Sequence, residues 1–454
     1  MKKKIKFRLS TTQVIALSFL FVIFIGSLLL SLPISTKSGV AVSYIDALFT
    51  STTATCVTGL VTLPTVSTWS VFGHIVIIIL IQIGGLGVIT VIAGVMIAMH
   101  RKFGLKDSQL IGDAFNLSSL SGLANFVKKV IIGTFVVEGI GAVLYMIVFI
   151  PEFGAKGIWI SIFNSISAFC NAGIDIIAEN SLCNYATNPL INFITCSLII
   201  LGGLGFIVWW DIIRVFKDFK KSKFRCFKKF TLHSKIVLVS TFILIFGGAI
   251  AIFIFEYNNP LTIKDYSIFD KIQISFFQSV TTRTAGFFTV PQENLTNASS
   301  IICLLLMFIG GSPIGTAGGI KTITIVVLLA TAYSTIKNKN EITIFNRNLS
   351  KQATRKAVAV TCMSFIIMFV STILLAFVCD APAIDILYET VSATATVGLT
   401  RNLTAFLNVW GKVIIISTMF LGRIGPISLA LAFNSKKKEV TNNIKYPTEE
   451  VSVG

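Results

Sequence analysis

The chain has 454 residues, of which 54% are hydrophobic and only 13% are charged. Its mean hydropathy is +0.84. A soluble domain could not hide this much apolar surface, so the composition excludes an ordinary soluble protein and favours a membrane protein. The formal net charge of +18 could suggest nucleic-acid binding. The basic residues, however, lie between the apolar segments, and no soluble stretch is long enough to fold a nucleic-acid-binding domain.

The apolar segments come in four pairs along the chain, and each is long enough to cross roughly 30 Å of hydrocarbon, which takes about 20 helical residues. The expected outer helices are 14–32, 130–150, 237–255 and 357–378, and the expected inner helices are 75–99, 191–210, 301–329 and 414–433. The first apolar run is longer than the core of a signal peptide, and no small-residue cleavage site follows it. We therefore interpret it as an uncleaved first span.

Basic residues concentrate in segments 1–8, 100–129, 214–235, 337–356 and 436–445. The positive-inside rule makes these segments and both termini cytoplasmic. The expected organisation is four repeats at 10–100, 130–216, 237–336 and 357–434, with cytoplasmic linkers at 101–129, 217–236 and 337–356 and a cytoplasmic tail at 435–454. The loops between paired helices then lie on the outer side.

The loops between paired helices contain an internal repeat. An aromatic residue is followed ten positions later by a glycine at Phe49/Gly59, Phe163/Gly173, Phe276/Gly286 and Tyr388/Gly398. Successive glycines are 114, 113 and 112 residues apart. A short amphipathic segment that ends in a hydroxyl-rich turn and one glycine resembles a pore helix and the selectivity filter of a cation channel. We therefore predict an all-α integral membrane protein with eight spans and four half-length re-entrant helices.

Four such loops could form one ion filter. Irregular backbone at membrane depth is tolerated only where it is buried in protein or lines a water-filled path. Loops related by fourfold pseudo-symmetry can aim carbonyl oxygens at one axis and replace the water around a cation. The expected ligands are backbone oxygens of Val57, Thr58, Gly59, Asn171, Ala172, Gly173, Thr284, Ala285, Gly286, Thr396, Val397 and Gly398.

The motifs resemble those of the Trk/Ktr superfamily of potassium uptake proteins, specifically its Ktr-type membrane subunit. They are Thr55-Cys-Val-Thr-Gly-Leu60, Ser165-Ile-Ser-Ala-Phe-Cys-Asn-Ala-Gly173, Phe277-Gln-Ser-Val-Thr-Thr-Arg-Thr-Ala-Gly-Phe287 and Tyr388-Glu-Thr-Val-Ser-Ala-Thr-Ala-Thr-Val-Gly-Leu399. The chain also ends in a similar signature, Tyr446-Pro-Thr-Glu-Glu-Val-Ser-Val-Gly454. The resemblance implies potassium uptake, a homodimer, and a cytosolic ring of nucleotide-binding regulatory subunits.

The third inner helix is expected to be broken. Its run of glycines and Pro313 cannot sustain regular helix, and a phosphate-binding loop is disfavoured because Gly-Lys-Ser/Thr is absent. The resemblance implies an intramembrane gate in this loop, at which Ile314 stands where many family members have glycine. The expected gate residues are Gly310, Gly311, Ser312, Pro313, Gly315, Thr316, Gly318, Gly319 and Lys321, with Arg423 from the fourth inner helix.

Arg423 is a functional-site hypothesis because an arginine in the bilayer is costly. In the family an arginine here faces the pore and bonds to the gate loop; the alternative is a structural pair with Glu138 or another buried acid. Glu138 and Glu389 are expected to satisfy neighbouring donors. Asp175 is expected either to attract cations at the mouth or to cap a turn. The doublets Gly84-Gly85 and Gly202-Gly203 are expected to allow close helix packing.

We conclude from the sequence that the chain carries potassium through a pore with one filter glycine in each repeat, in a bacterial plasma membrane. The alternatives are a sodium- or ammonium-passing member of the same family and a non-conducting accessory subunit. Catalytic constellations, metal clusters and nucleotide fingerprints are absent from the sequence, so we expect no enzyme, no cofactor and no nucleic-acid partner, with potassium as the transported substrate.

Overall fold

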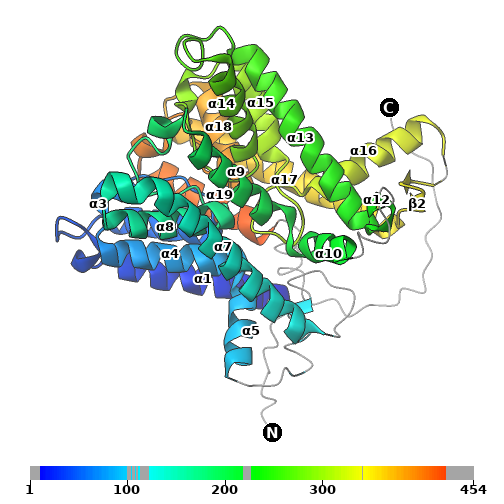
Figure 1. The fold of residues 1–454 in the computed structure, drawn as a ribbon, viewed down its shortest axis with the longest axis horizontal. Coiled ribbons are helices and arrows are strands. Elements are labelled where there is room, and N and C mark those ends of the chain that lie inside the picture. Colours follow the sequence, from blue (N-terminus) through cyan, green and yellow to red (C-terminus); the bar gives the residue numbers. More distant parts are fainter. Residues whose placement is uncertain are drawn as a thin grey trace.

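The computed structural model describes residues 11–99, 122–217, 226–339 and 341–425, together with residues 104, 108, 111 and 112. These residues are mostly helical, which confirms the predicted all-α membrane class (Figure 1). Within this part of the chain, strand structure is confined to an antiparallel hairpin of β1 (Thr343–Ile344) and β2 (Arg347–Asn348). The hairpin lies inside the linker expected at 337–356.

Four outer helices are long and apolar enough to cross a bilayer. They are α1 (Thr11–Leu30), α7 (Leu123–Phe153), α13 (Leu232–Glu256) and α17 (Lys351–Val378). Large apolar side chains such as Phe21, Phe135, Phe242 and Phe377 are exposed on their outward faces. Contiguous apolar surface of this kind is covered by lipid in a membrane protein.

A shorter helix follows each outer helix: α2 (Tyr44–Cys56), α8 (Lys156–Cys170), α14 (Ile268–Thr281) and α18 (Ala383–Ala395). These helices have 13 to 15 residues, or about 20 Å at 1.5 Å per residue, which is too short to cross a bilayer. The hydroxyls of Ser43 and Ser267 cap α2 and α14. These are the four predicted re-entrant helices.

The first two inner helices are broken, so the continuous helices expected at 75–99 and 191–210 are wrong. The chain bends by 96° between α4 (Val71–Leu86) and α5 (Val88–Ala98), and by 99° between α9 (Pro189–Leu204) and α10 (Phe206–Lys217). Figure 1 shows α5 turning away from the end of α4. The bends fall at Gly87 and Gly205, whose φ angles of +84° and +87° are incompatible with a right-handed helix.

The third inner helix is broken as predicted, into α15 (Asn297–Phe308) and α16 (Thr322–Ile336). The fourth inner helix, α19 (Val409–Ile424), ends at Gly425, which has a φ of +87°. Gly425 thus has the same backbone conformation as Gly87 and Gly205, the glycines at which the first two inner helices bend. Residues 426–433 of the helix expected at 414–433 lie outside the described residues. The remaining short elements are α3 (Thr65–Thr68), α12 (Cys226–Lys229), η1 (Pro33–Ser35), η2 (Cys183–Tyr185), η4 (Gln292–Asn294) and η5 (Thr404–Phe406).

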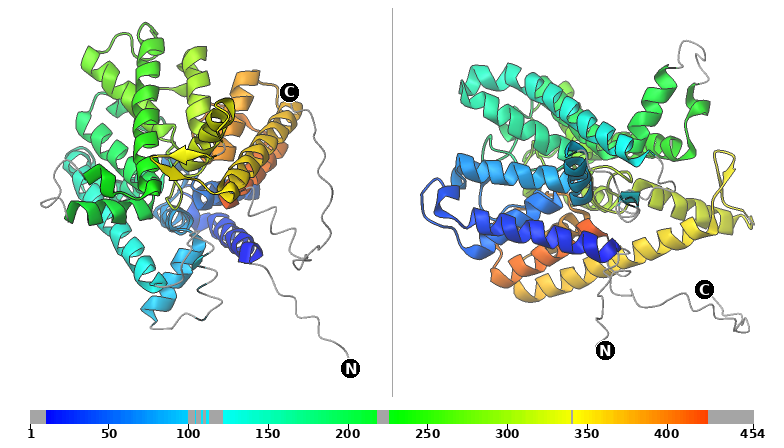
Figure 2. Two further views of the ribbon diagram at one scale, coloured as in Figure 1. Left: turned by 90° about the vertical axis from the view of Figure 1, so that its right-hand side faces the viewer. Right: turned by 90° about the horizontal axis from the view of Figure 1, so that it is seen from below.

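The repeats pack in a closed cycle. The inner helix of each repeat contacts the re-entrant helix of the next, in the pairs α4–α8, α9–α14, α15–α18 and α19–α2. The last pair brings the two ends of the described chain together, and both views of Figure 2 show the blue first segment beside the orange-red last one. The four loops that follow the re-entrant helices therefore meet at the centre.

The glycine doublets serve this packing, as the sequence predicts. A side chain at Gly84 would overlap the carbonyl oxygen of Thr55 in α2, and a side chain at Gly202 would overlap that of Phe169 in α8. A methyl group at either position would push an inner helix away from its re-entrant helix. The glycines thus set how closely the inner helices approach the loops.

Candidate functional site

The four central loops share one backbone conformation. Two residues before each loop glycine, the chain adopts a left-handed φ between 51° and 68°, at Val57, Asn171, Thr284 and Thr396. The glycines that follow also have positive φ, from 64° to 102°. Left-handed backbone is a genuine outlier for β-branched residues such as Val57 and Thr396. The surrounding structure must therefore hold these loops in place.

The four loop glycines form a ring. A β-carbon built on each of them would lie between 2.7 and 3.4 Å from the Cα of a loop glycine in another repeat. These neighbour relations link Gly59 to Gly173, Gly173 to Gly286, Gly286 to Gly398 and Gly398 back to Gly59. Any side chain would fill the centre of the ring, so only glycine leaves it open.

Backbone carbonyls crowd the same ring. A β-carbon on each glycine would overlap the carbonyl oxygen that precedes the next glycine, and the four oxygens belong to Thr58, Ala172, Ala285 and Val397. Each oxygen comes from a different repeat. Carbonyl oxygens converging on one axis can take the place of water around a dehydrated cation. The structure therefore brings all twelve sequence-predicted filter residues together.

Hydroxyl groups of the re-entrant helices anchor three of the loops. Gly59 N donates to Thr53 Oγ1 at 3.0 Å, Ile174 N to Ser167 Oγ at 3.1 Å and Gly398 N to Ser392 Oγ at 3.0 Å. Each hydroxyl residue stands six positions before its loop glycine. The third repeat has Val280 there, and Thr281 Oγ1 instead donates to Phe287 O. Sequence reasoning missed these anchors, although the spacing repeats in the sequence.

The glycine-rich loop between α15 and α16, residues 309–321, lies directly against the ring. Gly318 N donates to Thr284 Oγ1 at 3.2 Å, and Thr316 Oγ1 donates to Phe169 O at 3.1 Å. Ser312 N and Thr316 N donate to the carbonyls of Gly203 and Gly202, at 3.0 and 3.2 Å. We call residues 309–321 the gate loop, after the role that the sequence predicts for them. These hydrogen bonds to the walls around it satisfy part of the loop's backbone, which irregular backbone inside a membrane protein requires.

Ile314 adopts a left-handed φ of +61° within the gate loop. This conformation is strained for a β-branched residue, whereas glycine would adopt it without strain. Ile314 is held there by packing against the core, and its carbonyl accepts from Phe206 N at 2.9 Å. Packing and this hydrogen bond therefore hold Ile314 in a conformation that is strained for isoleucine.

Arg423 binds the gate loop and does not pair with Glu138. Its Nη1 donates to Thr316 O at 2.7 Å and its Nη2 to Gly84 O at 2.5 Å. Glu138 accepts from Gln82 Nε2 at 3.3 Å and from Cys170 Sγ at 3.7 Å. The sequence left open whether Arg423 bonds to the gate loop or pairs with a buried acid, and the structure shows the bond to the gate loop.

A cavity of ≈ 940 Å³ opens beneath the gate loop. Among the described residues, its lining contains four basic side chains and no acidic one: His233, Lys321, Lys356 and Arg423. Lys321 Nζ donates back to the gate loop, to Ala317 O at 2.6 Å. The positive charge of this lining raises the energy of a cation that enters the cavity.

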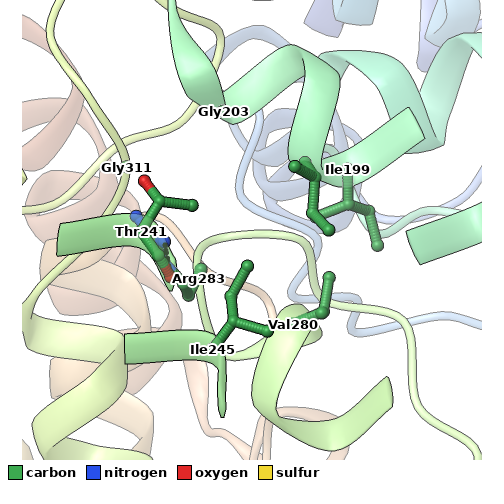
Figure 3. Close-up of a pocket in the computed structure, with 8 residues that line it drawn as sticks. Ile199, Gly203, Thr241, Ile245, Val280, Arg283 and Gly311 are labelled. Carbon is green, nitrogen blue, oxygen red and sulfur yellow. Dashed lines mark hydrogen bonds between the residues drawn. The ribbon is translucent and has the colours of Figure 1, made fainter. Parts of the chain in front are cut away.

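A second buried arginine, Arg283, directly precedes Thr284 of the third loop and lines a small cavity with Thr241 and Gly311 (Figure 3). Its Nη2 donates to Gly310 O at 3.2 Å, where the gate loop begins. Within the described part of the chain, Arg283 Nε and Thr241 Oγ1 have no hydrogen-bond partner, and both residues line one cavity of ≈ 10 Å³. That space suits a single water molecule.

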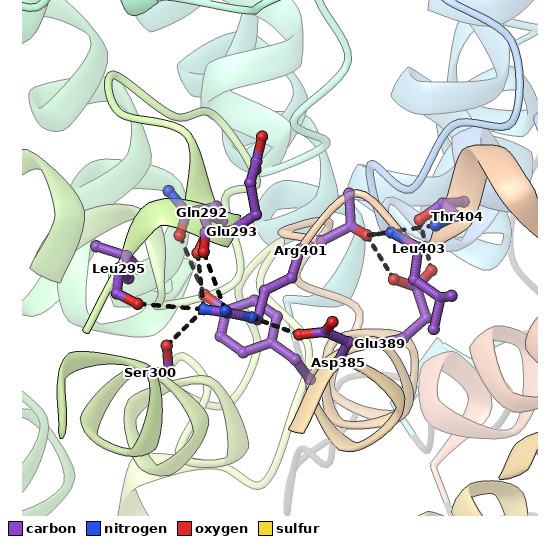
Figure 4. A network of polar contacts seen from close by, with 11 residues as sticks. Gln292, Glu293, Leu295, Ser300, Asp385, Glu389, Arg401, Leu403 and Thr404 are labelled. Carbon is purple, nitrogen blue, oxygen red and sulfur yellow. Dashed lines mark hydrogen bonds and ion pairs between the residues drawn. The ribbon is translucent and has the colours of Figure 1, made fainter. Parts of the chain in front are cut away.

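Arg401, three residues after the fourth loop glycine, links the third and fourth repeats through a network of polar contacts (Figure 4). It pairs with Asp385 at 2.6 Å and donates to Ser300 Oγ at 2.8 Å and Gln292 O at 3.0 Å. Beside it, Glu389 accepts from Thr400 Oγ1 at 2.6 Å and from Thr404 Oγ1. Glu389 thus supports the loop after the fourth filter glycine, as the sequence predicts.

The seam between the first and last repeats has its own ion pair, which sequence reasoning also missed. Lys412 Nζ lies 2.6 Å from Asp46 Oδ1, and Asp46 also accepts from Ser43 and Thr62, each at 2.8 Å. The two residues are 366 positions apart. Asp175, by contrast, accepts from Ile177 N at 3.4 Å in a local turn after the second loop.

The chain is similar to known cation transport proteins over nearly its whole length. The model of the TrkH family, described as cation transport proteins, matches residues 2–444. The chain is 40% identical over 448 residues to Ktr system potassium uptake protein B of Bacillus subtilis, covering 98% of this chain and 97% of that protein. It is 38% identical over 459 residues to potassium/sodium uptake protein NtpJ of Enterococcus hirae, covering 100% and 99%.

A solved structure shares the fold. The potassium transporter TrkH from Vibrio parahaemolyticus superposes with a TM-score of 0.74 over 95% of this chain and 86% of that chain, at 16% sequence identity. The family model extends over nearly all of the chain, and the relatives align nearly end to end. The protein therefore belongs to the TrkH family of cation transport proteins, which are transporters and not enzymes.

Proposed function

We propose that this protein takes up potassium through a single central pore, with the ring of four loop glycines as its selectivity filter. The observation that carries the proposal is the closed set of carbonyl oxygens from Thr58, Ala172, Ala285 and Val397, one from each repeat. Uncharged carbonyls suit a monovalent cation that must enter and leave quickly. Potassium is the cargo named for both the Bacillus and the Enterococcus relatives.

The gate loop is the proposed barrier beneath the filter. It lies across the inner side of the ring, and the cationic lining below it opposes the passage of potassium. Lys321 and Arg423 both bond to loop carbonyls, so they fix the loop in its blocking position. Opening then requires these bonds to break, which fits a transporter that is closed by default.

The finer assembly is also part of the proposal. We place both termini and the basic linkers in the cytoplasm of a bacterial cell, on the positive-inside rule. The names of the Bacillus and Vibrio alginolyticus relatives describe components of a Ktr system. We place the chain in a homodimer that binds a cytosolic ring of nucleotide-binding subunits, and this ring would regulate uptake, since the sequence itself shows no nucleotide-binding motif. Co-purification of the full-length chain with such a ring subunit tests this partnership.

The function is tested in a bacterium that lacks its own potassium uptake systems, with this chain expressed alone or with its regulatory subunit. Growth on low potassium is expected to be restored. Gly286→Ser is expected to lower the preference for potassium over sodium, because Gly286 has a φ of +88° and its β-carbon would lie 2.7 Å from Val397 O.

The matched control is Gly39→Ser. Gly39 also has a positive φ, of +69°, but a side chain there meets nothing within 4 Å. Gly39→Ser therefore imposes similar backbone strain away from the ring and should leave selectivity unchanged. If the two variants behave alike, the ring is not the filter. Equal uptake of potassium and sodium by the unaltered protein would instead favour a sodium-passing transporter, the activity included in the name of the Enterococcus relative.

A further inference from the structure

Thr316 is one of two gate-loop residues that form a hydrogen bond with a filter residue. Its side chain is fully buried, and its Oγ1 lies 3.1 Å from Phe169 O and 3.3 Å from Asn171 Oδ1. Its carbonyl accepts from Arg423 and its N–H donates to Gly202 O. One residue of the loop thus contacts the second filter loop, the second inner helix and the pore arginine.

Asn171 is one of the four left-handed filter residues, with a φ of +60°. The next residue, Ala172, supplies a carbonyl of the ring. The side chain of Asn171 also reaches the third loop, where its Nδ2 lies 3.5 Å from Arg283 O. A change in the position of Asn171 would therefore alter two sides of the filter.

The gate loop holds a second filter residue of the same kind. Gly318 N donates to Thr284 Oγ1 at 3.2 Å, and Thr284 is the left-handed residue of the third filter loop. The first and fourth loops have no such bond in the described structure, since Val57 has no polar side-chain group and Thr396 Oγ1 has no partner. The loop thus fixes two of the four filter segments.

We infer that Thr316 is a specificity-determining residue through which the position of the gate loop sets the shape and cation preference of the filter. When the loop moves aside, Asn171 and Thr284 lose the hydrogen bonds that hold their left-handed backbone. The filter is then less constrained while the gate is open. This inference rests on the proposed filter and gate, and adds that the two are energetically coupled.

Coupling between two sites is reciprocal for binding equilibria. If the gate loop changes the affinity of the filter for potassium, potassium in the filter must change the equilibrium of the gate loop by the same factor. A net hydrogen bond in a protein corresponds to a roughly two- to tenfold change in an equilibrium. If Thr316 only stabilises the gate loop, its substitution would make the gate easier to open, but potassium in the filter would not affect the gate.

The first experiment compares Thr316→Val, which removes the hydroxyl at nearly constant volume, with Thr316→Ser, which keeps it. Thr316→Val should raise basal uptake and change the potassium-to-sodium uptake ratio roughly two- to tenfold. Thr316→Ser should keep the ratio of the unaltered protein. The matched control is Thr195→Val, the same substitution at a residue that is equally buried. The Thr195 hydroxyl bonds to Tyr145 Oη, at 2.5 Å, and donates to Ile191 O, at 2.7 Å, and both partners lie outside the filter and the gate loop. Thr195→Val should leave the ratio unchanged.

The inference is overturned if Thr316→Val shifts the ratio no more than Thr195→Val does. That outcome leaves the filter proposal standing, since the filter is tested separately by Gly286→Ser against Gly39→Ser. Membrane insertion of each variant is measured in parallel.

A second measurement does not depend on the folding of Thr316→Val. A cysteine is placed at Ile320, which lines the cavity beneath the loop, and its reaction rate with a thiol reagent is followed in potassium and in sodium at equal ionic strength. The unsubstituted chain gives the background from native cysteines. Potassium should change the rate at least twofold relative to sodium, and adding Gly286→Ser should abolish the difference. A rate that does not depend on the cation contradicts the coupling.

Discussion

Arg423 donates through Nη1 to the carbonyl oxygen of Thr316, 107 positions earlier in the chain, at 2.7 Å. The other guanidinium nitrogen, Nη2, donates to Gly84 O. A single cation therefore ties the fourth inner helix to the gate loop and to the break in the first inner helix. No salt bridge to Arg423 is found among the described residues, and the two carbonyl dipoles stabilise its charge.

Arg423→Gln should raise basal potassium flux. Glutamine keeps a donor but loses the charge and one of the two bonds, and a charge-assisted hydrogen bond contributes about 1.5–3 kcal/mol, or roughly a ten- to hundredfold shift in the gate equilibrium. Arg423→Lys keeps the charge and should stay closer to the unaltered protein. Uptake is measured in vesicles without a regulatory subunit. Loss of folded protein in both variants, with no rise in flux, would support a purely structural role.

Asp46 and Lys412 should be energetically coupled across the seam of the ring. Their side chains are 12% and 15% exposed, so solvent screens the pair only in part. A double-mutant cycle with Asp46→Asn and Lys412→Met, read from thermal unfolding in detergent, should give a coupling energy of about 1–2 kcal/mol. The pair Asp385 and Arg401 at the neighbouring seam offers a parallel cycle. Additive effects of the two substitutions would show that the seam is held by apolar packing.

Gly202→Ala should destabilise the protein and reduce uptake, because the added methyl group would overlap the carbonyl oxygen of Phe169 in the helix that carries the second filter loop. The cost of such overpacking is typically about 1–3 kcal/mol. Gly247→Ala is the matched control: it too is a helical glycine, but its β-carbon would meet nothing within 4 Å. The control should be neutral or slightly stabilising, since alanine favours helix. Equal loss of stability in both variants would refute the packing explanation.

Uptake should depend on pH through Asp175 if this carboxylate attracts cations to the pore. Burial raises the pKa of Asp175 to about 6, although the backbone hydrogen bond from Ile177 N partly opposes the shift. Below pH 6 the group becomes neutral, so the apparent KM for potassium should rise as pH falls through this value. Asp175→Asn should show the high KM at every pH. If both proteins show the same pH profile, Asp175 does not attract potassium and only stabilises its local turn.

Lower pH should weaken potassium uptake through Asp175, but it should increase the contribution of Asp175 to the stability of the fold. The folded protein binds this proton more tightly than the unfolded chain does, so the contribution of Asp175 to stability is full below pH 4 and is lost as the pH rises through about 6. Thermal unfolding of Asp175→Asn should therefore vary less over this range than unfolding of the unaltered protein. The two readouts separate an effect on transport from an effect on folding.

The inner helices show where sequence reasoning succeeds and where it fails. The break in the third inner helix could be predicted because Pro313 and its neighbouring glycines forbid a regular helix locally. The breaks at Gly87 and Gly205 could not, because a single glycine is tolerated within a helix. Their positive φ angles depend on the packing around them: Gly205 lies against Pro313 O of the gate loop. That contact joins residues 108 positions apart.

The sequence by itself determined the membrane class, the four repeats, the re-entrant helices and the glycines of the ring, because apolar length, repeat spacing and glycine content are properties of short segments. Tertiary structure alone decided how the ring closes and which polar groups hold it: Arg423 on Thr316, Lys412 on Asp46, and Arg401 on Asp385. Each of these charged side chains has several possible partners in the sequence. Only the packing of the repeats into a closed cycle brings one set of partners within hydrogen-bonding distance.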